Sequence, residues 1–145
     1  MRISTKGRYG LRTLMDIAIH QGDGPVTLND ISRRQDISVK YLWQVINPLK
    51  TSGILSVTRG ARGGYTLAKR PEEITMLEVV SVLEGPLALV DCLGKDSLCE
   101  RIDSCVARSV WREVGAAVER VLSGIRFDEV LKRYEDSSDV NNFVI

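Results

Sequence analysis

Two β-type runs meet at a glycine-rich tip in the segment 54-ILSVTRGARGGYTLA-68. Apolar and polar residues alternate in each run, which predicts strands over about residues 54–59 and 64–68. The tip between the runs carries Arg59 and Arg62 among three glycines. The segment therefore predicts a β-hairpin that presents basic side chains at its turn.

Three helices are predicted ahead of this hairpin. Apolar residues at three- and four-residue steps predict a first amphipathic helix, which ends before the turn-forming residues 21–25. Thr27 is placed to cap a short second helix, and Ser38 to cap a third helix over about residues 39–51. Three helices followed by a hairpin make a winged helix-turn-helix.

The second half of the chain predicts a long helix over about residues 105–124. Its apolar stripe is too long for the small winged domain to cover, so pairing with a second copy of the chain is the economical way to bury it. A short helix around residues 127–134 and a polar tail follow. The fold class is mostly α with a small β-hairpin wing and a long dimerisation helix, whose predicted contact residues are Val110, Trp111, Val114, Val118 and Val121.

The charge of the chain is divided unevenly between its halves. Residues 1–71 hold 12 Lys and Arg against 4 Asp and Glu, a net of +8, whereas residues 72–145 hold 8 against 15, a net of −7. Such a split indicates that the first half meets a polyanion, although a solvated surface would give the same counts. We expect a DNA-binding domain over residues 1–71. Residues 72–145 would hold a cysteine loop at about 91–105, the dimerisation helix and the C-terminal tail.

The third helix of such a domain enters the major groove, and the hairpin tip suits a narrow minor groove. Basic residues at the start of the first helix would neutralise phosphates. Trp43 either packs beneath the third helix or lies against a sugar or thymine methyl group, and we expect it to pack. The predicted DNA contacts are Arg2, Lys6, Arg8, Ser38, Lys40, Tyr41, Gln44, Arg59, Arg62 and Gly63.

All three cysteines of the chain, Cys92, Cys99 and Cys105, lie within fourteen residues. Clustered thiols in a chain without a secretory signal indicate metal or redox chemistry more than structural disulfides. Zinc and iron–sulfur clusters usually take four ligands, of which the thiols supply three. Spacings of six and five residues suit a loop around something larger than one ion. A thiol-redox or zinc-bound regulator remains the alternative.

Several segments resemble the Rrf2 family of bacterial winged-helix regulators. They are residues 1–11 (MRISTKGRYGL), residues 30–32 (DIS), the wing at residues 59–67 (RGARGGYTL), residues 82–86 (VLEGP) and the three-cysteine loop followed by Trp111. Within the family the chain is most similar to the IscR type, which senses iron–sulfur cluster status. The resemblance implies a homodimer on promoter DNA, a cluster, typically 2Fe–2S, on the three cysteines, and dimerisation through the helix that contains Trp111.

The fourth ligand is where the chain departs from its relatives. Regulators of the IscR type have a histidine three residues after the last cysteine, where this chain has Arg108. The related NsrR takes an acidic ligand from the partner's first helix near the position of Arg8. Arginine cannot ligate iron at either place, so the fourth ligand stays open. The first half and the ending also resemble CymR, a cysteine-metabolism repressor that lacks the three cysteines.

These observations predict a DNA-binding transcriptional regulator of iron–sulfur cluster or sulfur metabolism genes, and not an enzyme. A CymR-like regulator without a cluster is the alternative, and an enzyme of sulfur metabolism is a candidate partner for the acidic half. No apolar run approaches the roughly 20 residues that cross a bilayer, and the N-terminus lacks an apolar signal segment. We therefore expect a cytoplasmic protein with no membrane contact.

Overall fold

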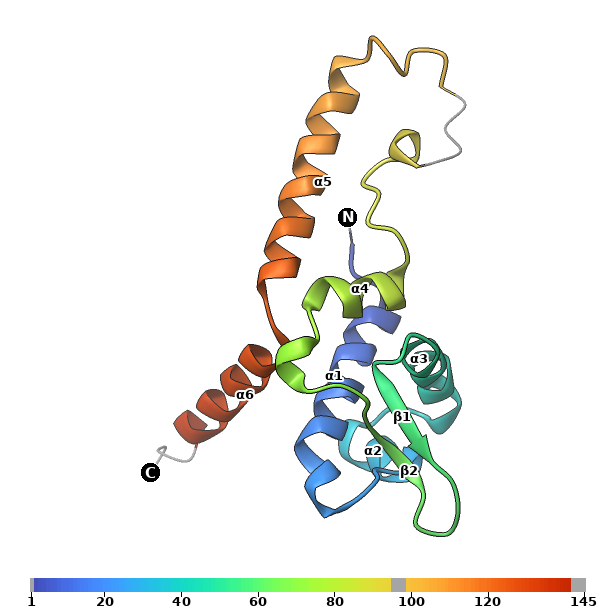
Figure 1. The fold of residues 1–145 in the computed structure, drawn as a ribbon, viewed down its shortest axis with the longest axis vertical. Coiled ribbons are helices and arrows are strands. Elements are labelled where there is room, and N and C mark those ends of the chain that lie inside the picture. Colours follow the sequence, from blue (N-terminus) through green and yellow to red (C-terminus); the bar gives the residue numbers. More distant parts are fainter. Residues whose placement is uncertain (1, 95–98, 142–145) are drawn as a thin grey trace.

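The computed structural model describes residues 2–94 and 99–141. Residues 95–98 of the predicted cysteine loop and the end of the predicted tail lie outside this part of the chain. The helices and strands, in chain order (Figure 1), are α1 (Thr5–His20), α2 (Leu28–Gln35), α3 (Val39–Thr51), β1 (Leu55–Thr58), β2 (Gly64–Leu67), α4 (Met76–Glu84), α5 (Val106–Gly124) and α6 (Phe127–Asn141).

Four helices begin at hydroxyl caps, two of which, Thr27 and Ser38, the sequence predicts. Ser4 Oγ accepts a hydrogen bond from Gly7 N at 3.2 Å, and the caps of α2, α3 and α4 use their hydroxyls in the same way. Each cap satisfies a backbone N–H that the first turn of a helix leaves without a partner. The starts of these helices are therefore fixed by local chemistry, at Ser4, Thr27, Ser38 and Thr75.

The two strands form the predicted antiparallel hairpin, with Leu55 opposite Leu67 and Thr58 opposite Gly64. The hairpin is also joined to the segment between α1 and α2. There, Val26 and Tyr65 exchange backbone hydrogen bonds of 2.9 and 2.8 Å. The inward side chains of the hairpin join the apolar faces of α1, α2 and α3 in one hydrophobic core. This arrangement is the winged helix-turn-helix that the sequence predicts.

The second half of the chain is anchored on the same core. Ile74, Val79 and Phe127 are fully buried in it. Backbone hydrogen bonds from Met76 N to Ile125 O and from Phe127 N to Ile74 O, both 2.9 Å, fasten the base of α5 and the start of α6 to the segment before α4. Figure 1 shows the chain after α4 running away from this body and α5 leading back to it.

Helices α1 and α4 cross at close range because α1 has glycines at the contact. A Cβ atom on Gly7 would meet Glu84 Oε1 at 2.0 Å, and one on Gly10 would meet Leu83 Cδ1 at 2.3 Å. Glu84, the last residue of α4, also accepts hydrogen bonds from Ser4 N at 3.1 Å and Ser4 Oγ at 2.8 Å. The end of α4 is therefore tied to the beginning of α1.

Two expectations about the elements are wrong. The helix expected around residues 127–134 continues to Asn141 as α6, because no glycine or proline follows Phe127 to stop it. Trp43 does not pack beneath α3 but is 46% exposed, since the buried face of α3 is filled by other apolar residues. Pro48 lies inside α3, which continues past it to Thr51.

Candidate nucleic-acid interface and cysteine loop

Helix α3 presents two opposite stripes of side chains. Leu42, Val45, Ile46 and Leu49 are fully buried in the core. Lys40, Trp43, Gln44 and Asn47 are exposed and follow the same i, i+3, i+4, i+7 spacing. This spacing places residues along one face of a helix. The exposed stripe is therefore a continuous surface that contains the predicted contacts Lys40 and Gln44.

Two other predicted contacts of α3 have structural roles at its beginning. Ser38 Oγ caps the helix by accepting from Tyr41 N at 3.2 Å. Tyr41 is half-buried, and its ring meets Tyr9 of α1 edge-on at a centroid distance of 5.5 Å. These contacts fix the start of α3 against α1, so any base contact by Ser38 would use an oxygen that also serves as the cap.

The wing tip presents the two predicted arginines and is shaped by glycine. Arg59 and Arg62 are both exposed. A Cβ atom on Gly63 would lie 2.3 Å from Thr58 O and 2.9 Å from Gly60 O, so no larger residue fits without moving the backbone. Gly63 therefore gives the turn its shape, and the arginines supply its charge.

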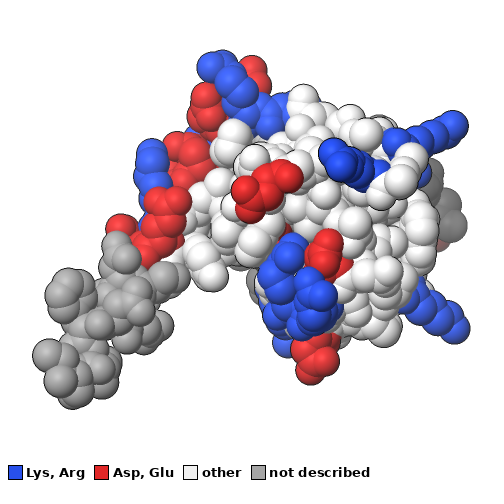
Figure 2. All heavy atoms as spheres, turned by 90° about the horizontal axis from the view of Figure 1, so that it is seen from below, with Lys and Arg blue, Asp and Glu red and all other residues white. Residues whose placement is uncertain are grey.

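The remaining predicted contacts lie at the start of α1. Arg2 and Arg8 are exposed, and Lys6 is half-buried. Arg8 Nη2 donates to Thr5 Oγ1 at 3.2 Å, which leaves most of its guanidinium accessible. On the face shown in Figure 2, basic side chains project alone from the right-hand edge, on the side of the wing, whereas acidic and basic side chains alternate on the left, toward α6.

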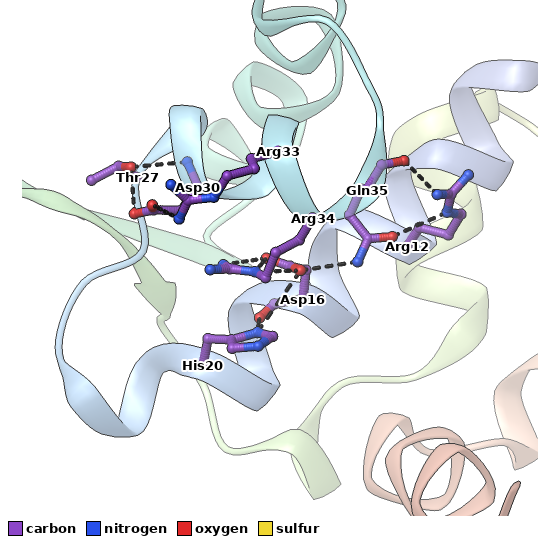
Figure 3. Close-up of polar contacts among 8 residues, drawn as sticks. All are labelled: Arg12, Asp16, His20, Thr27, Asp30, Arg33, Arg34 and Gln35. Carbon is purple, nitrogen blue, oxygen red and sulfur yellow. Dashed lines mark hydrogen bonds and ion pairs between the residues drawn. The ribbon is translucent and has the colours of Figure 1, made fainter. Parts of the chain in front are cut away.

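An ion pair between the buried Asp16 and the partly exposed Arg34 fixes α1 to α2, and sequence reasoning missed it (Figure 3). Asp16 is 1% exposed and accepts from Arg34 Nη2 at 2.7 Å and Arg34 Nε at 3.0 Å. Gln35 Nε2 adds a bond of 2.9 Å, and His20 Nδ1 lies 2.8 Å from the Asp16 carbonyl oxygen. The hydrogen bonds to Asp16 raise the pKa of Arg34 above its usual value. A carboxylate on the apolar stripe between Leu14 and Ile17 was the signal in the sequence.

Arg12 extends this network toward α3. Its Nη2 donates to Gln35 O at 2.6 Å and its Nε to Gln35 Oε1 at 3.2 Å. The guanidinium also lies 5.4 Å from the centroid of the Tyr9 ring, which contacts Tyr41. Arg12 thus ties α1 to the end of α2, and Tyr9 ties α1 to the start of α3. These contacts fix the turn between α2 and α3 against α1.

The cysteine loop offers three free thiols. Cys92 lies in a short 3₁₀ turn and is half-buried, Cys99 is exposed, and Cys105 is the half-buried residue just before α5. In the described ranges 2–94 and 99–141, no three His, Cys, Asp or Glu side chains lie close enough together to hold a metal ion. The thiols suit iron or zinc in ligand type, and the structure does not bring them together.

Arg108 closes the base of this loop. Its Nε donates to the Cys92 carbonyl oxygen at 3.1 Å, across sixteen residues of sequence. Arg108 lies in the first turn of α5, just after Cys105, so the contact holds the two ends of the loop to each other. The segments that carry Cys92 and Cys105 are therefore held together by Arg108.

The outward face of α5 carries the predicted dimerisation residues. Val110, Trp111, Val114 and Val121 are 42–61% exposed, and Val118 is half-buried. No residue of α5 is buried within the chain. Exposed apolar side chains of this size on one helix face indicate a surface that another molecule covers. No helix in the described part of the chain is long and apolar enough to span a membrane.

Comparison with known proteins agrees with this geometry. Residues 3–133 match the profile of the Rrf2 family, described as an iron-dependent transcriptional regulator. The chain is similar to the Rrf2 protein of Nitratidesulfovibrio vulgaris, at 39% identity over 132 residues that cover 91% of this chain and 88% of that protein.

Two solved structures are similar over most of their length. IscR of T. potens has a TM-score of 0.76 and 38% identity, covering 94% of this chain and 90% of that one. CymR, the global cysteine regulator of B. subtilis, has a TM-score of 0.75 and 34% identity, covering 92% and 98%. Together with the winged helix-turn-helix, these matches show that the chain belongs to the Rrf2 family of DNA-binding transcriptional regulators and is IscR-like.

Proposed function

We propose that this chain regulates transcription in response to iron–sulfur cluster status, through a cluster, 2Fe–2S, held by Cys92, Cys99 and Cys105. The DNA-binding form is a homodimer, and its targets are genes of iron–sulfur cluster or sulfur metabolism. One observation carries the proposal: three free thiols lie on the single loop that joins α4 to α5. When bound, a cluster would supply a centre whose presence depends on the supply of iron and sulfur.

The position of the loop supports control of DNA binding. The loop begins directly after Glu84, whose carboxylate accepts two hydrogen bonds from Ser4. Ser4 caps α1, the helix that begins with the predicted phosphate contacts Lys6 and Arg8. A change in the order of the loop can therefore reach the start of α1 through one residue and two hydrogen bonds.

The other end of the loop leads into the proposed dimer interface. Cys105 directly precedes α5, and Arg108 ties the first turn of α5 to Cys92. Two copies joined along α5 would hold two α3 helices at one separation, and DNA half-sites must match that separation. Ordering the loop would thus change DNA affinity or site choice by selecting one arrangement of the dimer.

Anaerobic reconstitution tests the proposal. The protein supplied with iron and sulfide under nitrogen should gain visible absorbance with iron and acid-labile sulfide bound. Cys92→Ala should lose the absorbance, and Ser104→Ala, an exposed residue of the same loop, should keep it. A colourless wild-type protein without sulfide contradicts cluster binding. A Cys92→Ala variant that selects the same DNA with the same affinity contradicts control by the cluster.

A thiol-redox or zinc regulator without a cluster is the second candidate. The exposure of Cys99 favours it, because an accessible thiol is open to oxidation, and the similarity to CymR agrees with it. Metal analysis and mass spectrometry separate the two candidates. Zinc without sulfide, or a disulfide among the three thiols that alters DNA binding, supports the second candidate and counts against the first.

A further inference from the structure

Trp43 lies at the centre of the surface that should meet the bases. It belongs to the exposed stripe of α3, one turn after Lys40 and one turn before Asn47, and Gln44 follows it in the chain. The opposite stripe of the helix is fully buried, so the stripe with Trp43 is the one that faces away from the body. The stripe has one large apolar side chain among three polar ones.

The surroundings of Trp43 decide what it can contact. Its stripe neighbours are one cation and two amides, which match the acceptors and donors on base edges in the major groove. An apolar protein partner would leave those three side chains without comparable partners. The Trp43 side chain is 46% exposed, so it needs no rearrangement to reach out.

The major groove of duplex DNA has few sites where a large apolar side chain can make an apolar contact. Base faces are stacked and closed to it, and base edges are polar except for the thymine 5-methyl group. A residue at the rim of the helix would meet sugars, but Trp43 lies in the middle of the row, between two side chains suited to base edges. We propose that Trp43 packs against a thymine methyl group in each half-site and makes this protein select thymine there.

This inference rests on the proposed DNA binding and is tested apart from the cluster. Sites are first selected from a random duplex library with the wild-type protein. Each thymine of the selected site is then replaced by deoxyuridine, which lacks only the methyl group. Affinities are measured for the wild type, for Trp43→Ala and Trp43→Phe, and for Ile19→Ala. Ile19 is 42% exposed near the far end of α1 and serves as the matched loss of an exposed apolar side chain.

The affinity of the wild-type protein should depend on the methyl group of one thymine in each half-site. Removing a single buried methyl group there is expected to weaken binding about fourfold, and about 15-fold when both half-sites are changed. Trp43→Ala should bind the thymine and deoxyuridine sites equally, Trp43→Phe should keep part of the difference, and Ile19→Ala should keep all of it. Circular dichroism and the melting temperature show that each variant is folded.

Three results would overturn the inference. The wild type and Trp43→Ala could respond equally to every deoxyuridine, the wild type could respond to none, or Ile19→Ala could lose the preference as Trp43→Ala does. In each case a DNA site has been selected, so DNA binding stands and only the role of Trp43 fails. If the wild-type protein selects no sequence at all, both the proposed DNA binding and the role of Trp43 are contradicted.

Discussion

Asp16 is a charge inside a hydrophobic core, and its partners explain why the fold tolerates it. Both carboxylate oxygens accept hydrogen bonds from Arg34, and Gln35 adds another. A buried carboxylate is tolerated where donors satisfy it, whereas one that loses its partners is strongly destabilising. The pair therefore specifies how α1 and α2 meet more than it adds to stability.

Asp16→Asn should lower the free energy of unfolding by about 2 kcal/mol, because the neutral amide loses charge-assisted hydrogen bonds that the buried carboxylate accepts from Arg34. Urea unfolding followed by circular dichroism measures the loss. The control is Arg33→Gln, which breaks the exposed 2.8 Å pair with Asp30 and should cost about 0.5 kcal/mol or less. Equal losses in the two variants would contradict the role given to the pair of Asp16 and Arg34.

Asp30 makes the stability of the fold depend on pH, because it accepts a hydrogen bond from the cap residue Thr27. The hydrogen bond from Thr27 Oγ1, at 2.7 Å, is the main cause that lowers the pKa of Asp30, and the charges of Arg33 and Arg34 add to it. A carboxyl whose pKa is lower in the folded state stabilises the fold above its unfolded pKa, near 3.8. That contribution disappears as the pH falls through the folded value.

Thr27→Val should therefore raise the pKa of Asp30 toward its ordinary value and make the unfolding free energy less dependent on pH below about 4. An NMR titration of the Asp30 carboxyl carbon measures the first effect, and acid unfolding measures the second. Thr27→Ser keeps the hydroxyl and should titrate as the wild type does. An unchanged pKa in the valine variant would show that the hydroxyl is not the cause.

Among the elements, the wing depends on one glycine for its shape. Gly63→Ala places a Cβ atom 2.3 Å from Thr58 O, a backbone atom that cannot move alone. We expect the tip to rearrange, DNA affinity to fall about tenfold and the melting temperature to drop by several degrees. Gly22→Ala is the control, because nothing lies within 4 Å of its new Cβ atom. Fluorescence anisotropy and thermal melts measure both variants, and the same affinity for Gly63→Ala and the wild type would contradict the expectation.

Helix α5 should assemble through its apolar face. Val114→Asp puts a charge in the middle of the proposed interface and should convert the dimer to a monomer in analytical ultracentrifugation. A charge buried there without a partner opposes association strongly. Ala116→Asp adds the same charge at an exposed position on the opposite side of α5 and should stay dimeric. Sedimentation of both variants as the same species would place the interface elsewhere.

The elements that sequence predicted well are those set by neighbouring residues. The predicted caps of α2 and α3 act over three residues, and the hairpin follows from alternation and glycines. Features that depend on distant partners were missed. Asp16 finds Arg34 eighteen residues away, and the exposure of Trp43 follows from which residues fill the core beneath α3. The roles assigned to the three cysteines stay predictions, because a ligand set depends on how the whole loop closes.

At the scale of the whole molecule, α5 stands away from the body that holds the wing and α3 (Figure 1), and its exposed valines and Trp111 lie on this projecting helix. The wing and the exposed stripe of α3 belong to the winged helix-turn-helix, whereas the cysteine loop joins the end of α4 to the start of α5. The predicted DNA contacts and the proposed subunit contact thus belong to different parts of the chain, with the loop between them.

Binding to DNA should fall steeply with salt, because lysines and arginines displace counterions from phosphates. Replacing both Arg59 and Arg62 by Ala removes four cations from a dimer, so the slope of log affinity against log salt should decrease by about 3 to 4. Anisotropy titrations at four salt concentrations measure it. The control is Arg120→Ala, which changes an exposed residue of α5 and should leave the slope unchanged. An unchanged slope in the wing variant would show that Arg59 and Arg62 do not contact DNA.

The absence of any buried side chain along the nineteen residues of α5 has a consequence for the living cell. In the proposed dimer the exposed valines and Trp111 of α5 gain their cover from a second copy, so the melting temperature of the protein should rise with its concentration. A higher concentration of the protein in the cell would then lengthen the lifetime of its folded form, and dilution by cell growth would shorten it.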